Sequence, residues 1–169
     1  GVAVIDTGVN AVPGLHHRNK VVDGPDLSFD ALEDNLRHRD AHGHGTNMAS
    51  IIAAKDAPAG GDGIAPDARI VNVKVGAGDG TVDVSQVIAA IDWVVQNRDH
   101  AGSNIRVISL AYDTDASQSY VLDPLSHAVE NAWRAGIVVV VAGGNDGRGI
   151  HRLGNPAFNP FVIAVGGVE

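Results

Sequence analysis

The sequence predicts a single α/β domain built on a parallel β-sheet. Short runs rich in Val and Ile alternate along the chain with segments whose apolar residues recur at helical spacing, a pattern that indicates βαβ units. Several of the apolar runs are unbroken, as expected for strands that are covered on both faces. A length of 169 residues fits one domain, and no internal repeat or low-complexity tract divides it.

The first half of the chain begins this alternation. Val2–Asp6 is an apolar run stopped by the turn signal Thr7-Gly8, so we expect a buried strand there. Residues 44–55 carry small or apolar side chains at helical spacing and predict a helix. After a loop rich in Pro, Gly and Asp, the alternating residues 69–75 predict a second strand.

The second half continues the same order of elements. Residues 84–96 place their apolar side chains on one helical face, and Asp83 precedes them as a candidate N-cap. Residues 105–110 predict a strand, and residues 125–135 predict a helix that stops before Gly136. Two further apolar runs, at 137–142 and 161–165, predict the last two strands.

Composition excludes several classes of function. Twenty acidic and twelve basic residues give a net charge of −8, which argues against a nucleic-acid partner. The chain has no Cys, and so no disulfide, Cys-ligated zinc or thiol nucleophile. No apolar run approaches the roughly 20 residues of a membrane helix, so we expect no membrane partner.

Polar residues end three of the expected strands, at Asp6, Ser109 and Asn145, and the carboxyl ends of parallel strands are where such sheets carry their sites. The carboxylate of Asp6 is suited to holding a histidine, although Asp before Gly is also a common turn. Asp-Thr-Gly occurs in aspartic proteases as well, where two such carboxylates share a proton. We reject that reading because only one Asp-Thr-Gly is present, in a chain with helical periodicity.

The segment His42-Gly43-His44-Gly45-Thr46 stands at the expected start of a helix. Glycines on both sides leave the His44 imidazole little steric cover, so it can face a substrate. A solvated histidine in a Gly-rich loop is the plain alternative. A metal site formed by Asp40, His42 and His44 is another, but no fourth ligand is indicated.

The apolar run at 137–142 leads into Gly143-Gly144-Asn145-Asp146-Gly147. The Asn145 amide can donate a hydrogen bond to an oxygen that becomes negative during acyl transfer. The alternative is a plain Asn-Asp-Gly turn. Residues 76–81, Gly-Ala-Gly-Asp-Gly-Thr, lie between a strand and a helix as a dinucleotide fingerprint would. The third glycine falls one place early, so a Rossmann-like nucleotide-binding domain remains only a minor alternative.

Together these blocks resemble the subtilisin-like serine protease family (subtilases, peptidase family S8). Asp6 in Val-Ile-Asp-Thr-Gly, His44 in Gly-His-Gly-Thr 38 positions later, and Asn145 after an apolar run follow the family's order. The resemblance covers nearly the whole chain, so residues 1–169 are identified as a partial catalytic domain of this family. Two departures are Asn47, where many relatives have a second His, and Ala111, where Gly is usual.

The resemblance implies a three-layer, doubly wound and mostly parallel sheet with helices on both faces, truncated at its C-terminus. It implies a serine endopeptidase in which Asp6 orients His44, His44 is the general base and Asn145 completes the oxyanion hole. The substrate would be a peptide or protein in extended conformation, bound partly by strand addition. The implied substrate-binding residues are Gly78, Asp79, Gly80, Ser109, Leu110, Ala111, Ala142, Gly143 and Gly144, the last six as opposite walls of the S1 pocket.

The family's nucleophile lies in a Gly-Thr-Ser-Met-Ala block, which this sequence does not contain. Both ends look cut, so we expect an N-terminal piece of the domain that is inactive alone. A non-catalytic domain that keeps the fold for binding is the alternative. The resemblance also implies an extracellular or cell-envelope location and a monomer when complete. Calcium is common in the family, but no ligand loop is recognised here, and we assign no metal or cofactor.

Overall fold

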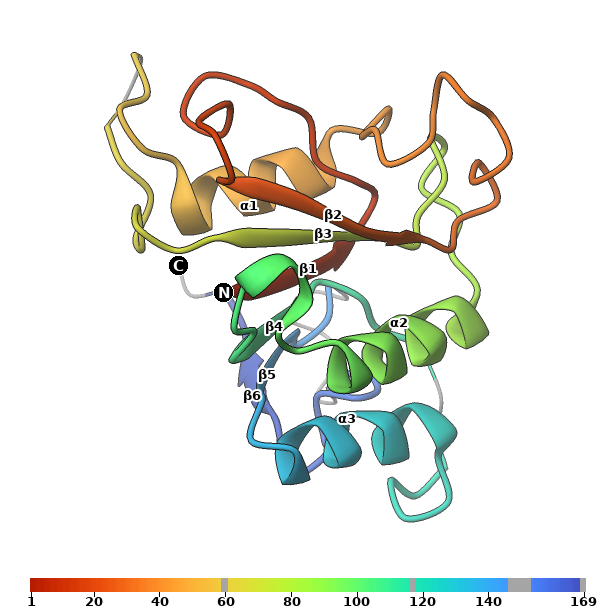
Figure 1. Ribbon diagram of the computed structural model, residues 1–169. Helices are drawn as coiled ribbons and strands as arrows, with labels where there is room; N and C mark the ends of the chain where they lie inside the picture. Colours follow the sequence, from red (N-terminus) through yellow and green to blue (C-terminus); the bar gives the residue numbers. More distant parts are fainter. Residues whose placement is uncertain (59–60, 116–117, 146–152, 168–169) are drawn as a thin grey trace.

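The computed structural model describes residues 1–58, 61–115, 118–145 and 153–167 (Figure 1). Six parallel strands form one sheet in the order β2-β3-β1-β4-β5-β6 within this part of the chain. The strands are β1 Val2–Asp6, β2 Val21–Asp26, β3 Ile70–Lys74, β4 Val107–Leu110, β5 Val138–Ala142 and β6 Ile163–Val165. The helices are α1 His44–Ala53, α2 Val84–Gln96 and α3 Pro124–Arg134, with a 3₁₀ turn, η1, at His100–Gly102.

Side chains of the central strand β1 alternate between two cores. Ala3 and Ile5 join an apolar cluster with α2 and α3 on one face of the sheet. Val4 packs on the other face in a second cluster with Ala49 and Ala53 of α1. Figure 1 shows α1 on one side of β2 and β3 and α2 on the other. The predicted α/β architecture, a parallel sheet with helices on both faces, is confirmed.

The register of the strands gathers the carboxyl ends of four strands on the same side of the sheet. Asp6 at the end of β1 is paired with Lys74 of β3, and Ile5 is paired with Leu110 of β4. Leu110 is in turn paired with Val141 of β5. The loops that follow these four strands therefore begin side by side, at the edge where a site is expected.

The expected strands and helices are all present, with boundaries shifted by at most two residues. Asp83 is confirmed as an N-cap: its Oδ1 accepts the Ser85 N–H at 2.8 Å, while the Gln86 Oε1 accepts the Asp83 N–H at 2.7 Å. The strand β2 was not predicted. It lies at the edge of the described sheet, is mostly half-buried, and contains Gly24 and Pro25, so it lacks the apolar run that marks a central strand. Among the described residues, no helix has the length and apolar character needed to cross a bilayer.

Candidate active site

Asp6 and His44 meet at the carboxyl edge of the sheet. Asp6 is the last residue of β1, and His44 is the first residue of α1. The His44 Nδ1 lies 2.8 Å from Oδ1 and 3.0 Å from Oδ2 of Asp6, which is the separation expected of an imidazole oriented by a carboxylate. The Asp6 side chain is 4% exposed and the His44 side chain 41%. The carboxylate is therefore sheltered, while part of the imidazole remains accessible.

Gly45 allows this contact because it brings α1 against β1 and the turn that follows. A Cβ at position 45 would lie 2.2 Å from the Gly8 carbonyl oxygen and 3.1 Å from the Asp6 Cβ. Both separations are closer than side-chain atoms normally pack. Any larger residue would push the start of α1, and His44 with it, away from Asp6.

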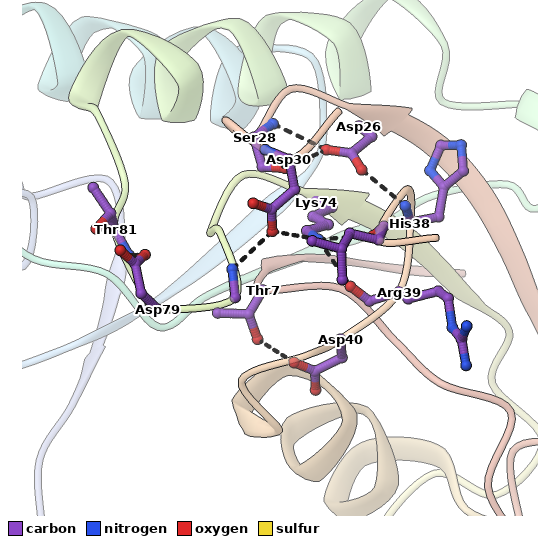
Figure 2. Close-up of polar contacts among 12 residues, drawn as sticks. Thr7, Asp26, Ser28, Asp30, His38, Arg39, Asp40, Lys74, Asp79 and Thr81 are labelled. Carbon is purple, nitrogen blue, oxygen red and sulfur yellow. Dashed lines mark hydrogen bonds and ion pairs between the residues drawn. The ribbon is translucent and has the colours of Figure 1, made fainter. Parts of the chain in front are cut away.

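Thr7 and Asp40 hold the first turn of α1 from outside the helix (Figure 2). The Thr7 hydroxyl donates to Asp40 Oδ1 at 2.8 Å and accepts the Gly45 N–H at 3.0 Å. Asp40 also accepts the N–H groups of Gly43 at 2.6 Å and Thr46 at 2.8 Å. These bonds satisfy N–H groups that a helix start leaves without an intrahelical partner.

The same bonds decide the charge state of Asp40. Burial by itself would raise the pKa of this carboxyl, but the hydrogen bonds from Thr46, Gly43 and Thr7 outweigh it and keep the pKa below its usual value. Sequence reasoning considered Asp40 only as a metal ligand beside His42 and His44. In the described part of the chain no three His, Cys, Asp or Glu residues are grouped as a metal site, and the Asp40 oxygens face the start of α1 instead.

A cavity of about 270 Å³ opens beside the Asp6–His44 pair. Its walls combine the pair with apolar side chains and with two of the expected substrate-binding residues, Gly80 and Ala111. The lining residues are Ile5, Asp6, Thr7, His42, His44, Val75, Gly80, Val82, Ala111 and Tyr112. An accessible imidazole in a partly apolar cavity is an arrangement suited to proton transfer on a bound substrate.

The Gly78-Asp79-Gly80 segment forms a tight turn beside this cavity. The Ala77 N–H donates to the Thr81 carbonyl at 3.0 Å, and the Gly80 N–H donates to the Ala77 carbonyl at 2.9 Å. Gly80 has a φ of +86° and lies against the ring of His42, since a Cβ there would be 3.1 Å from Nε2. The Thr81 N–H bonds the Asp79 carboxylate and lowers the pKa of that exposed group.

Residues 109–111 form the end of β4 and the first position after it. Ser109 is half-buried and in register with Val140 of β5. Leu110 as a whole is 1% exposed, and its side chain packs in the core beneath α2 and α3. Ala111 is exposed and lines the cavity.

Residues 142–144 form the end of β5, the neighbouring strand, and the two positions after it. The Gly143 N–H donates to the Val165 carbonyl at 2.7 Å, and the Gly143 carbonyl accepts from Gly154 at 3.3 Å. Both backbone groups of Gly143 are thus already engaged. Ala142 and Gly144 are half-buried, and Asn145 is an exposed residue in the bend that follows. The remainder of its motif, residues 146 and 147, lies outside the described residues.

Several site residues escaped sequence reasoning. Thr7 was read only as part of a turn signal, although its hydroxyl connects β1 to α1. Asp40 precedes His44 by four positions, and this spacing next to a helix start is the signal that could have indicated its role. Asp30 and Lys74, which face each other (Figure 2), are far apart in sequence and gave no signal.

Comparison with known proteins extends these observations. The model of the subtilase family, peptidase S8, matches residues 1–169. The serine protease AprX of Bacillus subtilis (strain 168) is 34% identical over 174 residues, which cover 99% of this chain and 38% of AprX. The minor extracellular protease Epr of the same organism is 32% identical over 164 residues, covering 97% of this chain and 22% of Epr.

Among solved structures, sphericase superposes with a TM-score of 0.80 at 32% identity, covering 96% of this chain and 51% of sphericase. The chain thus spans about half the length of that structure and less than half of AprX and Epr.

Proposed function

Since this chain belongs to the subtilase family, we propose that it supplies the acid–base pair and the oxyanion donor of a serine endopeptidase. The observation that carries the proposal is the bond from His44 Nδ1 to the sheltered carboxylate of Asp6, 2.8 Å long. That pair stands in a cavity whose lining includes Gly80 and Ala111, two residues proposed to contact an extended peptide.

In this proposal His44 moves the proton and Asp6 fixes its geometry. The Asp6 carboxylate accepts the Nδ1–H, which selects the tautomer whose Nε2 can take a proton from a serine hydroxyl. When His44 becomes an imidazolium, the adjacent negative charge stabilises it. His44 then returns the proton to the leaving amine, so the bond to Nδ1 has to persist through the cycle.

Asn145 is proposed as the donor to the oxyanion of the tetrahedral intermediate. Its exposed position beyond the end of β5 supports this role, because an exposed amide can reach a bound substrate. Loss of such a donor costs about 10²–10³-fold in kcat in subtilisin, a member of the same family.

The nucleophile is proposed to come from a Gly-Thr-Ser block outside these 169 residues, since the sequence contains no such block. The serine would attack the scissile carbonyl carbon while its proton passes to His44. Peptides or proteins are the proposed substrates. An extracellular location remains an expectation from the family, whose matched relatives carry both "extracellular" and "intracellular" in their names.

The test uses the protein extended to include the proposed nucleophile block. A serine-directed phosphonate should label the Gly-Thr-Ser serine, and His44→Ala should lower kcat by about six orders of magnitude, the scale of the catalytic His substitution in subtilisin. His127→Ala, an exposed histidine on α3, is the matched control and should leave turnover unchanged. An extended protein that folds but has no reactive serine would instead identify a non-catalytic binding domain.

A further inference from the structure

Lys74 of β3 has a side chain that is 0% exposed. Burying an ammonium group is costly unless hydrogen bonds and an opposite charge compensate it. Its Nζ lies 3.2 Å from Asp30 Oδ2, 3.0 Å from the Leu36 carbonyl oxygen and 2.9 Å from the Arg39 carbonyl oxygen. The three N–H donors of the ammonium thus meet three acceptors, all in the loop at residues 27–43, which we call the β2–α1 loop.

Asp30 also binds a second loop. The same Oδ2 that faces Lys74 also accepts the Gly78 N–H at 2.7 Å. Gly78 belongs to residues 75–83, which we call the β3–α2 loop. Figure 2 shows the Asp30 carboxylate directed toward Lys74. One carboxylate oxygen therefore joins the buried cation to the backbone of the turn that flanks the cavity.

These two loops form facing parts of the candidate active site. The β2–α1 loop contributes His42 and ends immediately before His44, and the β3–α2 loop contributes Gly80 and Val82. They also touch directly, since a Cβ on Gly78 would lie 3.1 Å from the Ala41 Cβ. The separation of the two cavity walls thus depends on the Asp30–Lys74 pair as well as on side-chain packing.

We propose that Asp30 and Lys74 are positioning residues for substrate, holding residues 78–80 where an extended peptide can pair with their backbone. The inference rests on the proposed function and adds to it a specific pair of residues. Strand addition needs the backbone of the receiving segment at a fixed place and orientation. Neither side chain lines the cavity, so both act through the Gly78 backbone. Their loss should weaken binding of long substrates and leave the acid–base chemistry of His44 unchanged.

The experiment compares two substrates in the protein that includes the proposed serine. One is a tetrapeptide that reaches residues 78–80, and the other is a single-residue ester with the same leaving group. Asp30→Asn keeps the size and an acceptor oxygen but removes the charge. We expect it to raise KM for the tetrapeptide about tenfold, the scale of a hydrogen bond to a charged group. The kcat values and the KM of the ester should change by less than about twofold.

Asp34→Asn is the matched control, because it removes one negative charge from an exposed position in the same loop. It should leave both substrates unaffected. Lys74→Met should affect the tetrapeptide at least as strongly as Asp30→Asn. The double variant should be no worse than Lys74→Met alone, since the two residues act as one unit. If Lys74→Met does not fold, Asp30→Asn alone decides the question.

Equal losses on the tetrapeptide and the ester would overturn the proposal. The proposal would also be overturned if a variant had a lower melting temperature but an unchanged KM for both substrates, because the pair would then have only a structural role. If the parent protein hydrolyses neither substrate, the proposed function fails, and calorimetric binding of a tetrapeptide amide decides the positioning role. About tenfold weaker binding by Asp30→Asn than by Asp34→Asn supports it, and equal binding refutes it.

Discussion

Replacing Gly45 by Ala tests whether close contact between α1 and β1 builds the Asp6–His44 pair. The added Cβ would lie 2.2 Å from the Gly8 carbonyl oxygen, where contacts under 3.0 Å essentially never occur. The start of α1 must therefore retreat by about 0.8 Å or more. That retreat also stretches the bond from the Gly45 N–H to the Thr7 hydroxyl, now 3.0 Å.

Overpacking of this kind costs about 1–3 kcal/mol, and weakening a buried hydrogen bond adds about 1 kcal/mol. We expect Gly45→Ala to lower the free energy of unfolding by about 3 kcal/mol. A displacement near 1 Å can also cost about 100-fold in rate where geometry matters this closely. Urea unfolding gives the first quantity, and kcat/KM of the extended protein gives the second.

Gly43→Ala separates steric overlap from backbone strain. Gly43 has a φ of +99° but nothing within 4 Å of an added Cβ, so only the left-handed conformation is penalised, by about 1–2 kcal/mol. If Gly45→Ala costs no more than Gly43→Ala, or unfolds within about 0.5 kcal/mol of the parent, the contact does not hold the pair as we have argued.

Three further predictions concern stability, each measured by urea unfolding. Because the folded-state pKa of Asp40 is lowered, its contribution is complete above the unfolded value of about 3.9 and is lost as pH falls through the folded pKa. The deficit of Asp40→Asn against the parent should thus be larger at pH 7 than at pH 3, and an equal deficit at both contradicts the charge argument. Asp83→Ala removes the capping box of α2 and should cost about 1 kcal/mol; no loss would show that tertiary packing alone fixes that helix start. Ile91→Ala empties a fully buried site and should cost about 3 kcal/mol, whereas Ile64→Ala, at a 90% exposed site, should change stability by less than about 0.5 kcal/mol.

Periodicity was sufficient to predict the elements that pack on both faces of the sheet. Val2–Asp6 is an unbroken apolar run whose last four residues are buried, so the pattern reports burial directly there. The equally apolar β5 buries only alternate residues, Val139 and Val141, against the layer of α2 and α3. The edge strand β2 is only half-buried, so its sequence does not need an apolar run. Its Gly24 and Pro25 read as a turn, and only its pairing with β3 makes it a strand.

The candidate site was predictable where a motif is contiguous. Asp6 and His44 each stand in a short distinctive block, and their contact follows from the order of the elements. The interaction of Lys74 with Asp30 depends on how a 17-residue loop folds back over β3. Alternation along β3 assigns Lys74 to a face of the sheet. The residues next to Lys74 in the sequence do not indicate that this face is covered by a loop, or which carboxylate pairs with the ammonium.

The two unequal cores have a consequence for local opening of the molecule. Among the residues that the structure describes, twenty buried apolar residues hold the layer of α2 and α3, and six hold the layer of α1. Regions with little buried apolar area open at lower free energy and exchange their amide hydrogens sooner. We therefore expect the amides of α1 to exchange before those of α2. His44 is carried by that layer, so its alignment with Asp6 is maintained chiefly by the hydrogen bonds of Asp40 and Thr7. The bonds to the Asp40 carboxylate weaken with acid, whereas the α2 and α3 layer is held mainly by apolar burial, which acid leaves intact.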